Sequence, residues 1–233
     1  MTDKKTFISD SFAGAGIPID KQQTAQFLAL YDYMIEYNKS VNLTSITEFE
    51  DVVMKHFIDS VLPFADLNFP KEQSFIDVGT GAGFPALPLL IYRPDMRGTL
   101  CDSLNKRCVY LEKVCAEIGV TAHIIHERSE ELGRSLRESF DFAAARAVAA
   151  MPVLTELCLP FVKVGGYFVA LKSVNEDIHA ADNAVKILGG KLFKISDYKL
   201  PNGDDRRLAV VKKISQTPTK YPRSYANITK KPL

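Results

Sequence analysis

The residues with the clearest chemical meaning surround one short loop. An apolar run at 75–78 is followed by alternating glycines, then Pro85 and a second apolar run at 86–92. The glycines are Gly79, Gly81 and Gly83. Glycines let a ligand approach the backbone where a Cβ would collide, and a following helix would add unpaired N–H groups and partial positive charge. The pattern predicts a strand, a glycine loop and a helix around a nucleotide-like cofactor; a tight turn that binds nothing is the alternative.

The spacing of this loop fits two classes of cofactor. Gly81, Gly83 and Ala86 satisfy a dinucleotide pattern, with Asp102 at a suitable distance to meet a ribose. Asp77 favours the other class, because a carboxylate at the mouth of the site would repel a pyrophosphate and suit the cationic sulfonium of S-adenosylmethionine. The pattern D-x-G-x-G-x-G resembles the first motif of class I methyltransferases. We therefore expect Asp77 and the three glycines to bind S-adenosylmethionine, with an NAD-linked reductase as the alternative.

Polar residues after the next two strands extend this expected site. Asp102 closes a strand at 98–101, where a carboxylate can accept both ribose hydroxyls of a cofactor, although Asp is also a common helix N-cap. Ser129 and Glu130 follow a strand at 122–126, where the adenine edge of the cofactor is usually bound. Glu130 could instead be a first-turn helix charge.

Arg146 follows a strand at 140–144 and bears most directly on the reaction. No Asn-Pro-Pro-Tyr motif follows this strand, and no cysteine is preceded by proline, which argues against methylation of an exocyclic amine or of pyrimidine C5. A ring nitrogen with a free lone pair needs neither device, because its methylation requires alignment but no general base. Arg146 is therefore the candidate catalytic residue, orienting the cofactor or holding a base oxygen or phosphate; a structural ion pair is the alternative.

Alternating strands and helices from residue 74 onward predict an α/β fold. The expected strands lie at 75–78, 98–101, 122–126, 140–144, 167–171, 192–200 and 207–214, and the expected helices at 86–92, 106–118, 151–159 and 175–188. Such alternation builds a mostly parallel sheet with helices on both faces, and the turn at 201–204 indicates a closing antiparallel hairpin. This is the Rossmann-like arrangement of class I methyltransferases, seven-stranded with an antiparallel last strand.

The first 70 residues lack this alternation and read as a helical extension. Two helices, joined by a polar loop, are expected at 20–37 and 48–62. Asp20 and Gln23 resemble a capping box that opens the first helix, and Pro63 follows the second. The chain is accordingly divided into an N-terminal helical extension at 1–70, a cofactor-binding methyltransferase domain at 71–215 and a basic C-terminal tail at 216–233.

The composition limits the partners and the compartment. The 233 residues carry a formal net charge of +1, yet from Arg206 onward there are eight Lys or Arg residues and no Asp or Glu. Such basic blocks often contact nucleic acid, with a solvated tail as the alternative. No apolar run approaches a membrane span, no signal-type segment opens the chain, and the four cysteines form no C-x-x-C pair. We expect a cytoplasmic monomer with reduced thiols and no metal.

Together, these motifs resemble the RsmG (GidB) family, bacterial methyltransferases that modify guanine N7 in 16S ribosomal RNA. The matching stretches cover nearly the whole length and lie at 37–44, 56–60, 77–85, 102–107, 145–147 and 220–223. The resemblance implies S-adenosylmethionine as cofactor, S-adenosylhomocysteine as product, and the 530 loop of 16S rRNA or the small ribosomal subunit as target. It also implies that Gly79, Phe84, Ser129, Glu130 and Arg146 line the cofactor. Tyr37, often Trp in the family, and Ser129, often Ala, are departures; the Ser129 hydroxyl could alter the adenine pocket slightly.

Candidate RNA contacts are polar or basic residues scattered along the chain. They are Lys39, Asn42, His56, Lys106, Arg107, Lys172, Lys220 and Arg223. His56 lies in an apolar helix and could instead be a hydrogen-bonded core residue. Tyr221 and Tyr225 interleave with the tail charges, which suits base stacking. A ribosome-assembly or RNA-binding factor with a vestigial cofactor fold is a further alternative, disfavoured by the intact glycine motif and Arg146.

Overall fold

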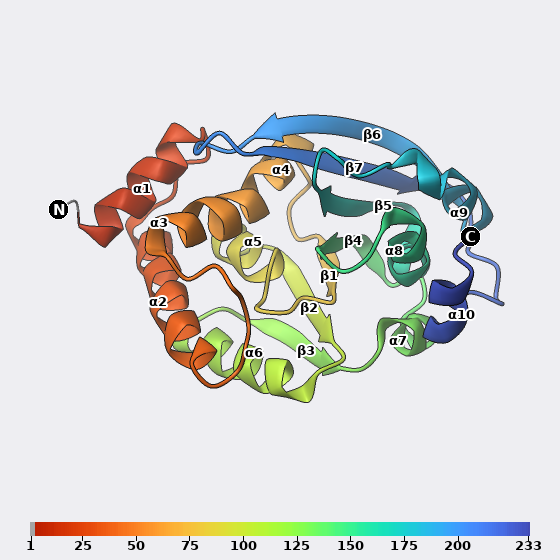
Figure 1. Cartoon of the computed structure of the whole chain (residues 1–233), viewed down its shortest axis with the longest axis horizontal. Helices are drawn as coiled ribbons and strands as arrows, with labels where there is room; N and C mark the ends of the chain where they lie inside the picture. Colours follow the sequence, from red (N-terminus) through yellow and green to blue (C-terminus); the bar gives the residue numbers. More distant parts are fainter. Residues whose placement is uncertain (1–2) are drawn as a thin grey trace.

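A computed structural model describes residues 3–233 and places seven strands in one sheet (Figure 1). The strands are β1 Ser74–Val78, β2 Arg97–Asp102, β3 Ala122–His126, β4 Phe140–Arg146, β5 Val162–Lys172, β6 Gly190–Lys199 and β7 Asp205–Lys213. Their order is β3-β2-β1-β4-β5-β7-β6, with β1 to β5 parallel and β7 antiparallel to both neighbours. The predicted sheet is therefore confirmed. The strand order reverses between β1 and β4, and open α/β sheets bind ligands outside the carboxyl ends at such a switch point.

Helices precede the sheet, connect its strands and close the chain. The α-helices are α1 Lys4–Gly14, α2 Lys21–Asn38, α3 Phe49–Val52, α4 Asp59–Leu67, α5 Ala86–Tyr92, α6 Asn105–Ile118, α7 Ser129–Ser135, α8 Met151–Cys158, α9 Asp182–Ile187 and α10 Tyr225–Lys230. A π-helix, Val53–Ile58, joins α3 to α4, and 3-10 turns occupy Leu159–Phe161 and His179–Ala181. The sequence did not lead us to expect α1, α7 or α10.

Each face of the sheet has its own core. Along β1, Phe75 packs with the N-terminal helices, α5 and α6, whereas Ile76 packs with α7, α8 and α9. The same alternation along β4 puts Ala144 on the first face and Ala145 on the second. Because successive side chains of a strand point to opposite faces, Arg146 leaves the sheet on the Ala144 face, toward the N-terminal helices.

The N-terminal helices dock through the ends of α5 and α6. The Asp20–Gln23 capping box at the start of α2 is present as predicted. The Gln23 side-chain amide also donates to the carbonyls of Ile91 (2.9 Å) and Tyr92 (3.2 Å), and Gln26 donates to the carbonyl of Ile118 (2.9 Å). Carbonyls in the last turn of a helix lack intrahelical donors, so α2 supplies the donors that these two helix ends need.

Two predicted helices differ from the structure. Pro63 lies inside α4 rather than beyond the helix end, since the helical backbone continues from the π-helix through α4 to Leu67. The chain stops there with Asn68 in the left-handed conformation (φ 46°), a common helix C-cap geometry. The helix expected at 175–188 is confined to a 3-10 turn and the short α9.

The C-terminal segment folds back onto the domain. Tyr221 and Ile228 are buried, and the fully buried Glu156 of α8 forms an ion pair with Arg223, with 2.6 Å between Arg223 Nη2 and Glu156 Oε2. The Arg137 guanidinium donates to the carbonyls of Thr217 (3.0 Å) and Tyr221. The tail is therefore packed rather than freely solvated, and α10 lies against the α7–α8 side of the molecule (Figure 1).

Candidate functional site

The glycine loop lies where β1 ends, and its glycines have different roles. A Cβ added to Gly79 would lie 2.8 Å from Val148 Cγ2, and Gly79 lines a cavity beside the loop. A Cβ added to Gly83 would lie 3.1 Å from Leu111 and closer still to Leu87, inside the core. Both glycines have positive φ angles, 69° and 91°, which favour glycine. Gly79 therefore borders a cavity, where its contact with a cofactor stays a prediction, whereas Gly83 is required for packing in the core.

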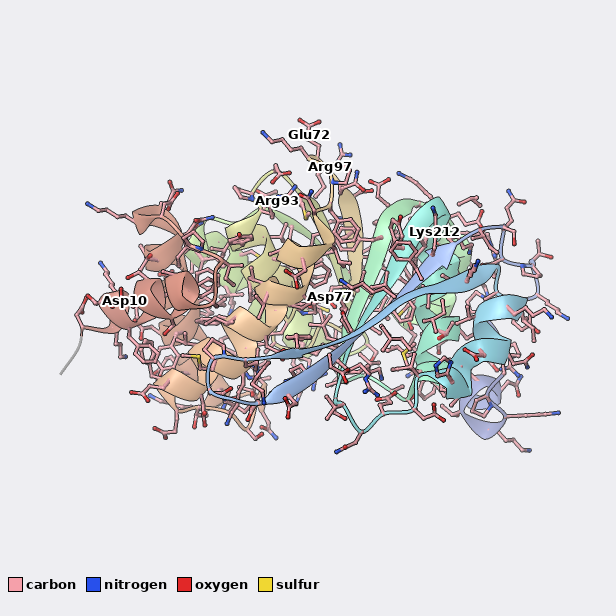
Figure 2. The ribbon with its side chains drawn as sticks, turned by 90° about the horizontal axis from the view of Figure 1, so that it is seen from above. Asp10, Glu72, Asp77, Arg93, Arg97 and Lys212 are labelled. Atoms are coloured by element: carbon pink, nitrogen blue, oxygen red, sulfur yellow. The ribbon has the colours of Figure 1, made fainter. Side chains whose placement is uncertain are left out.

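Asp77 lies beneath the loop, and the expectation of a carboxylate at the mouth is wrong. Its side chain is fully buried near the middle of the molecule (Figure 2). Asp77 Oδ2 accepts from Thr80 Oγ1 (2.7 Å) and from the backbone N–H of Ala86 (3.2 Å), the first residue of α5. Burial raises the pKa of Asp77 to about 7, against the opposing effect of these hydrogen bonds. Asp77 therefore fastens the loop to α5 rather than meeting solvent.

The cavity beside Gly79, here termed the loop cavity, has a volume of about 250 Å³. It is bounded by β1, β2, the start of α7, α8 and α10, and its polar lining includes Asp102, Ser129 and Glu130. Asp102 accepts from the backbone N–H groups of Gly81 (3.0 Å) and Leu104 (2.9 Å). The carboxylate thus braces the loop while lining the cavity.

The remaining wall of the loop cavity comes from α7 and from the tail. Glu130 is buried in the first turn of α7 and accepts from Arg128 Nε (2.7 Å). The Arg128 guanidinium lies 4.5 Å from the centre of the Tyr225 ring, and Tyr225 also lines the cavity. Tyr225, first considered for RNA stacking, thus lies at the predicted cofactor site.

A second cavity of about 550 Å³, here termed the arginine cavity, adjoins the first. Its lining includes the ionisable side chains of Lys55, His56, Asp59, Arg146, Lys172, Glu176 and Arg206. Val148 lines both cavities and packs over Gly79. The side chain of Val148 is therefore the wall between a site braced by carboxylates and a site rich in cations.

Arg146 is held by the N-terminal extension. Arg146 Nη1 donates to the carbonyl of Lys55 (2.8 Å) and lies 3.4 Å from Asp59 Oδ2, and Arg146 Nη2 lies 3.0 Å from His56 Nδ1. Its guanidinium carbon lies 5.1 Å from the centre of the Phe84 ring. Phe84 is buried beneath Arg146 and His56, so its predicted contact with the cofactor is replaced by support of these two side chains.

His56 is neutral and its tautomer follows from its partners. A guanidinium can only donate, so we assign His56 Nδ1, 3.0 Å from Arg146 Nη2, as an acceptor and place the ring proton on Nε2, 2.9 Å from Thr44 Oγ1. The Lys55 carbonyl, 3.2 Å from Nδ1, accepts from Arg146 Nη1 instead. Burial, with the nearby Arg146 charge, lowers the pKa of His56 to about 3. His56 lies in a π-helix, an element found often at functional sites, and it is a buried positioning group rather than an exposed RNA contact.

The other RNA-contact candidates fall into two groups. Lys39, Asn42, Lys106 and Lys220 are exposed, which leaves them as candidates. Lys172 is buried, where its ammonium binds Glu176 (2.8 Å) and the carbonyl of Ala149. Arg107 lies 3.3 Å from Asp102, and Arg223 binds Glu156. Lys172 is therefore not a surface contact, whereas Arg107 and Arg223 are partly exposed and paired within the protein, and their contacts with RNA stay predictions.

Sequence reasoning missed the acidic centre of the arginine cavity. Asp59 Oδ1 accepts from Tyr198 Oη (2.9 Å), and Asp59 Oδ2 lies 3.4 Å from Arg146 and 3.5 Å from Arg206. These residues come from α4, β4, β6 and β7. The one local signal was an Asp on the apolar face of an expected helix.

The strand order and the loop at its reversal define a class I methyltransferase fold. The same fold occurs in precorrin-6y C5,15-methyltransferase from Geobacter metallireducens, with 11% identity, TM-score 0.52, and coverage of 75% of this chain and 92% of that one. It also occurs in a 16S rRNA (adenine-N1)-methyltransferase variant from Catenulisporales acidiphilia, with 12% identity, TM-score 0.52, and coverage of 66% and 86%.

Sequence comparison narrows this class to one family. Residues 23–208 match the family model described as rRNA small subunit methyltransferase G. Curated relatives named ribosomal RNA small subunit methyltransferase G are 45% identical in Alkaliphilus metalliredigens, over 99% of both chains, and 45% identical in Lactobacillus johnsonii, over 94% of this chain and 95% of that one. The chain belongs to this family of enzymes, which argues against an NAD-linked reductase.

Among residues 3–233, no group of three or more His, Cys, Asp or Glu side chains is placed to hold a metal ion. Over the same residues, no helix has the length and apolar character needed to cross a membrane. The four cysteines are free and buried.

Proposed function

We propose that this protein transfers a methyl group from S-adenosylmethionine to N7 of a guanine in 16S rRNA, in the 530 loop. The products are S-adenosylhomocysteine and 7-methylguanine in the RNA. The observation that carries the proposal is the meeting of the loop cavity and the arginine cavity at Val148. Family membership, and the names of relatives as small-subunit rRNA methyltransferases, support the substrate.

The loop cavity fits the nucleoside part of the cofactor. Asp102 lines it with a carboxylate whose remaining lone pairs can accept ribose hydroxyls, and Ser129 and Glu130 offer polar atoms to the adenine. The cavity alone is smaller than ordinary small-molecule sites of about 300–1,000 Å³. The remainder of the cofactor therefore extends over Gly79 once the Val148 side chain turns aside, toward the arginine cavity.

The arginine cavity holds the acceptor base. When bound, S-adenosylmethionine supplies an electrophilic methyl group, and guanine N7 already carries a free lone pair, so the protein aligns the two without a general base. Methylation turns a neutral purine into a cation, and a guanidinium beside N7 would oppose that charge. Arg146 uses Nη1 and part of Nη2 within the protein. Its remaining N–H groups are suited to guanine O6 or a flanking phosphate.

Three further proposals concern the setting of the reaction. The enzyme acts in the cytoplasm as a monomer on 16S rRNA or the small ribosomal subunit. Lys39, Asn42, Lys106 and Lys220 contact the RNA backbone, since these side chains are exposed. The basic segment from Arg206 onward contributes mainly through Lys220 and the lysines of α10 and its end, because Arg223 is engaged in an ion pair.

The test is transfer of radiolabelled methyl to small-subunit RNA, followed by borohydride–aniline cleavage at 7-methylguanine. Arg146→Ala should lose about 2–4 kcal/mol of transition-state stabilisation, or about 30- to 1,000-fold in kcat/KM, as for loss of one electrostatic group. Arg146→Lys should recover little, because a point charge cannot replace the planar fork. Arg97→Ala, at an edge of the molecule remote from Asp77 (Figure 2), is the matched control. Label on N1, N2 or a ribose oxygen would refute the proposed function.

A further inference from the structure

The arginine cavity is lined by two carboxylates, Asp59 and Glu176. Asp59 is saturated by the protein, because Tyr198 donates to one oxygen and the guanidinium groups of Arg146 and Arg206 flank the other. Asp59 is also buried. The hydrogen-bonding capacity of Asp59 is therefore used within the protein, where it holds the cavity walls together.

Glu176 is held by only one of its oxygens. Glu176 Oε1 accepts from the backbone N–H of Met151 (2.9 Å), at the start of α8, and forms an ion pair with the Lys172 ammonium (2.8 Å). Over residues 3–233, Glu176 Oε2 makes no hydrogen bond, and the side chain is 25% exposed. Lys172 in turn donates to the carbonyl of Ala149, beside Val148. The result is a carboxylate fixed in orientation, with one oxygen free, in the cavity that holds Arg146.

A free carboxylate oxygen can distinguish guanine from adenine. A carboxylate is an acceptor without donors. Guanine offers adjacent donors at N1 and N2 on its Watson–Crick edge, whereas adenine presents an acceptor lone pair at N1. Proteins that bind unpaired RNA bases commonly hydrogen-bond to that edge. A carboxylate here would accept from guanine and repel adenine, and it would stabilise the positive charge that the ring gains on N7 methylation.

From this geometry we propose that Glu176 binds the Watson–Crick edge of the acceptor guanine and determines the choice of base. Met151 and Lys172 position the carboxylate through Oε1, which leaves Oε2 for the base. The proposal deepens the proposed function and rests on it, since it takes the arginine cavity as the acceptor site. In this arrangement Arg146 contacts guanine O6 or a flanking phosphate, and Glu176 contacts guanine N1 and N2.

The test uses Glu176→Gln and an RNA substrate carrying inosine at the modified position. Inosine keeps N7 and N1–H but lacks the N2 amino group. The wild-type enzyme should prefer guanine over inosine by about 10–100-fold in kcat/KM, the range expected when a buried acceptor loses a donor. Glu176→Gln keeps an oxygen for Met151 and Lys172 but replaces Oε2 by a donor. It should lower kcat/KM on guanine by about 10–100-fold, with a guanine-to-inosine ratio within about twofold of one.

Three controls separate the explanations. Asp59→Asn should slow both substrates while keeping the guanine-to-inosine ratio, because Asp59 shapes the cavity without reading the base. Glu117→Gln makes the same chemical change at an exposed position of α6 and should alter neither the rate of methylation nor the guanine-to-inosine ratio. Affinity for S-adenosylmethionine should be unchanged in Glu176→Gln. Equal wild-type rates on guanine and inosine, or a wild-type ratio in Glu176→Gln, would overturn the assignment of Glu176 alone. Absence of methyl transfer to any RNA would instead overturn the proposed function and this inference with it.

Discussion

The ion pair between Arg223 and Glu156 allows a sharp test of how the tail is held. Glu156 is fully buried on α8, and the Arg223 side chain and backbone supply all the hydrogen bonds to its carboxylate within residues 3–233. Removing one partner of a buried ion pair leaves an uncompensated charge that costs about 3–5 kcal/mol. The low end applies, because the Arg223 side chain is 24% exposed and water can reach the carboxylate. Arg223→Ala should therefore destabilise the protein by about 3 kcal/mol, a fall in Tm of about 6–12 °C for a domain of this size.

Urea unfolding and thermal denaturation measure this loss. Glu156→Gln combined with Arg223→Ala should recover part of it, because no buried charge then remains without a partner. Lys220→Ala, an exposed lysine of the same segment, is the control and should leave Tm unchanged within about 1 °C. If Arg223→Ala and Lys220→Ala had the same small effect on stability and the same effect on RNA binding, Arg223 would be a surface contact and the reasoning from burial would fail.

Three further predictions concern the loop and its surroundings. Gly79→Val should abolish binding of S-adenosylmethionine in a folded protein, because the new side chain meets Val148 at the mouth of the loop cavity, whereas Gly83→Ala should mainly lower Tm through its clash in the core; calorimetry with unchanged affinity in Gly79→Val contradicts this. Because burial raises the pKa of Asp77 from 3.8 to about 7, the folded protein keeps a proton that the unfolded chain releases, so the stability due to Asp77 is greatest below pH 3.8 and falls as the pH rises to about 7. As the pH rises across that window, the unfolding free energy of Asp77→Asn should increase relative to that of the wild type by about 1.4 kcal/mol per pH unit. Parallel pH profiles of the two proteins would exclude the effect. Tyr225→Ala should weaken binding of S-adenosylmethionine about tenfold and Tyr225→Phe should not, since the ring is the contact; equal affinities of Tyr225→Ala and the wild type would remove α10 from the cofactor site.

The apolar runs and the glycine loop predicted most of the fold. The apolar runs and their punctuation predicted every strand of the sheet and its antiparallel closing hairpin, because alternation of strands and helices leaves few topologies open. Asp77 lies between Ile76 and Val78 in a strand covered on both faces, and this position explains its burial. Placing its carboxylate at the mouth of the site overlooked that helices on both faces of the predicted sheet would cover it.

The composition of the arginine cavity could not be predicted in the same way. His56 and Asp59 are neighbours on one helical segment, but Arg146 and Arg206 lie far along the chain and join them only when β4 and β7 pack against that segment. A basic residue such as Lys172 or Arg223 looks alike in sequence whether it faces water or a buried carboxylate. Some helices and helix ends could not be predicted for a related reason. The π-helix and α10 depend on tertiary packing more than on local propensity.

Residues late in the sequence complete both cavities. Tyr225 closes the loop cavity, while Tyr198 and Arg206 hold the Asp59 that supports Arg146. During translation these residues emerge after every other wall of the site has been synthesised. A growing polypeptide therefore has a glycine loop without a finished loop cavity, and an arginine without its full set of anchors. The ribosome that makes this protein meets a complete pair of cavities only after residues 198–225 have left its exit tunnel.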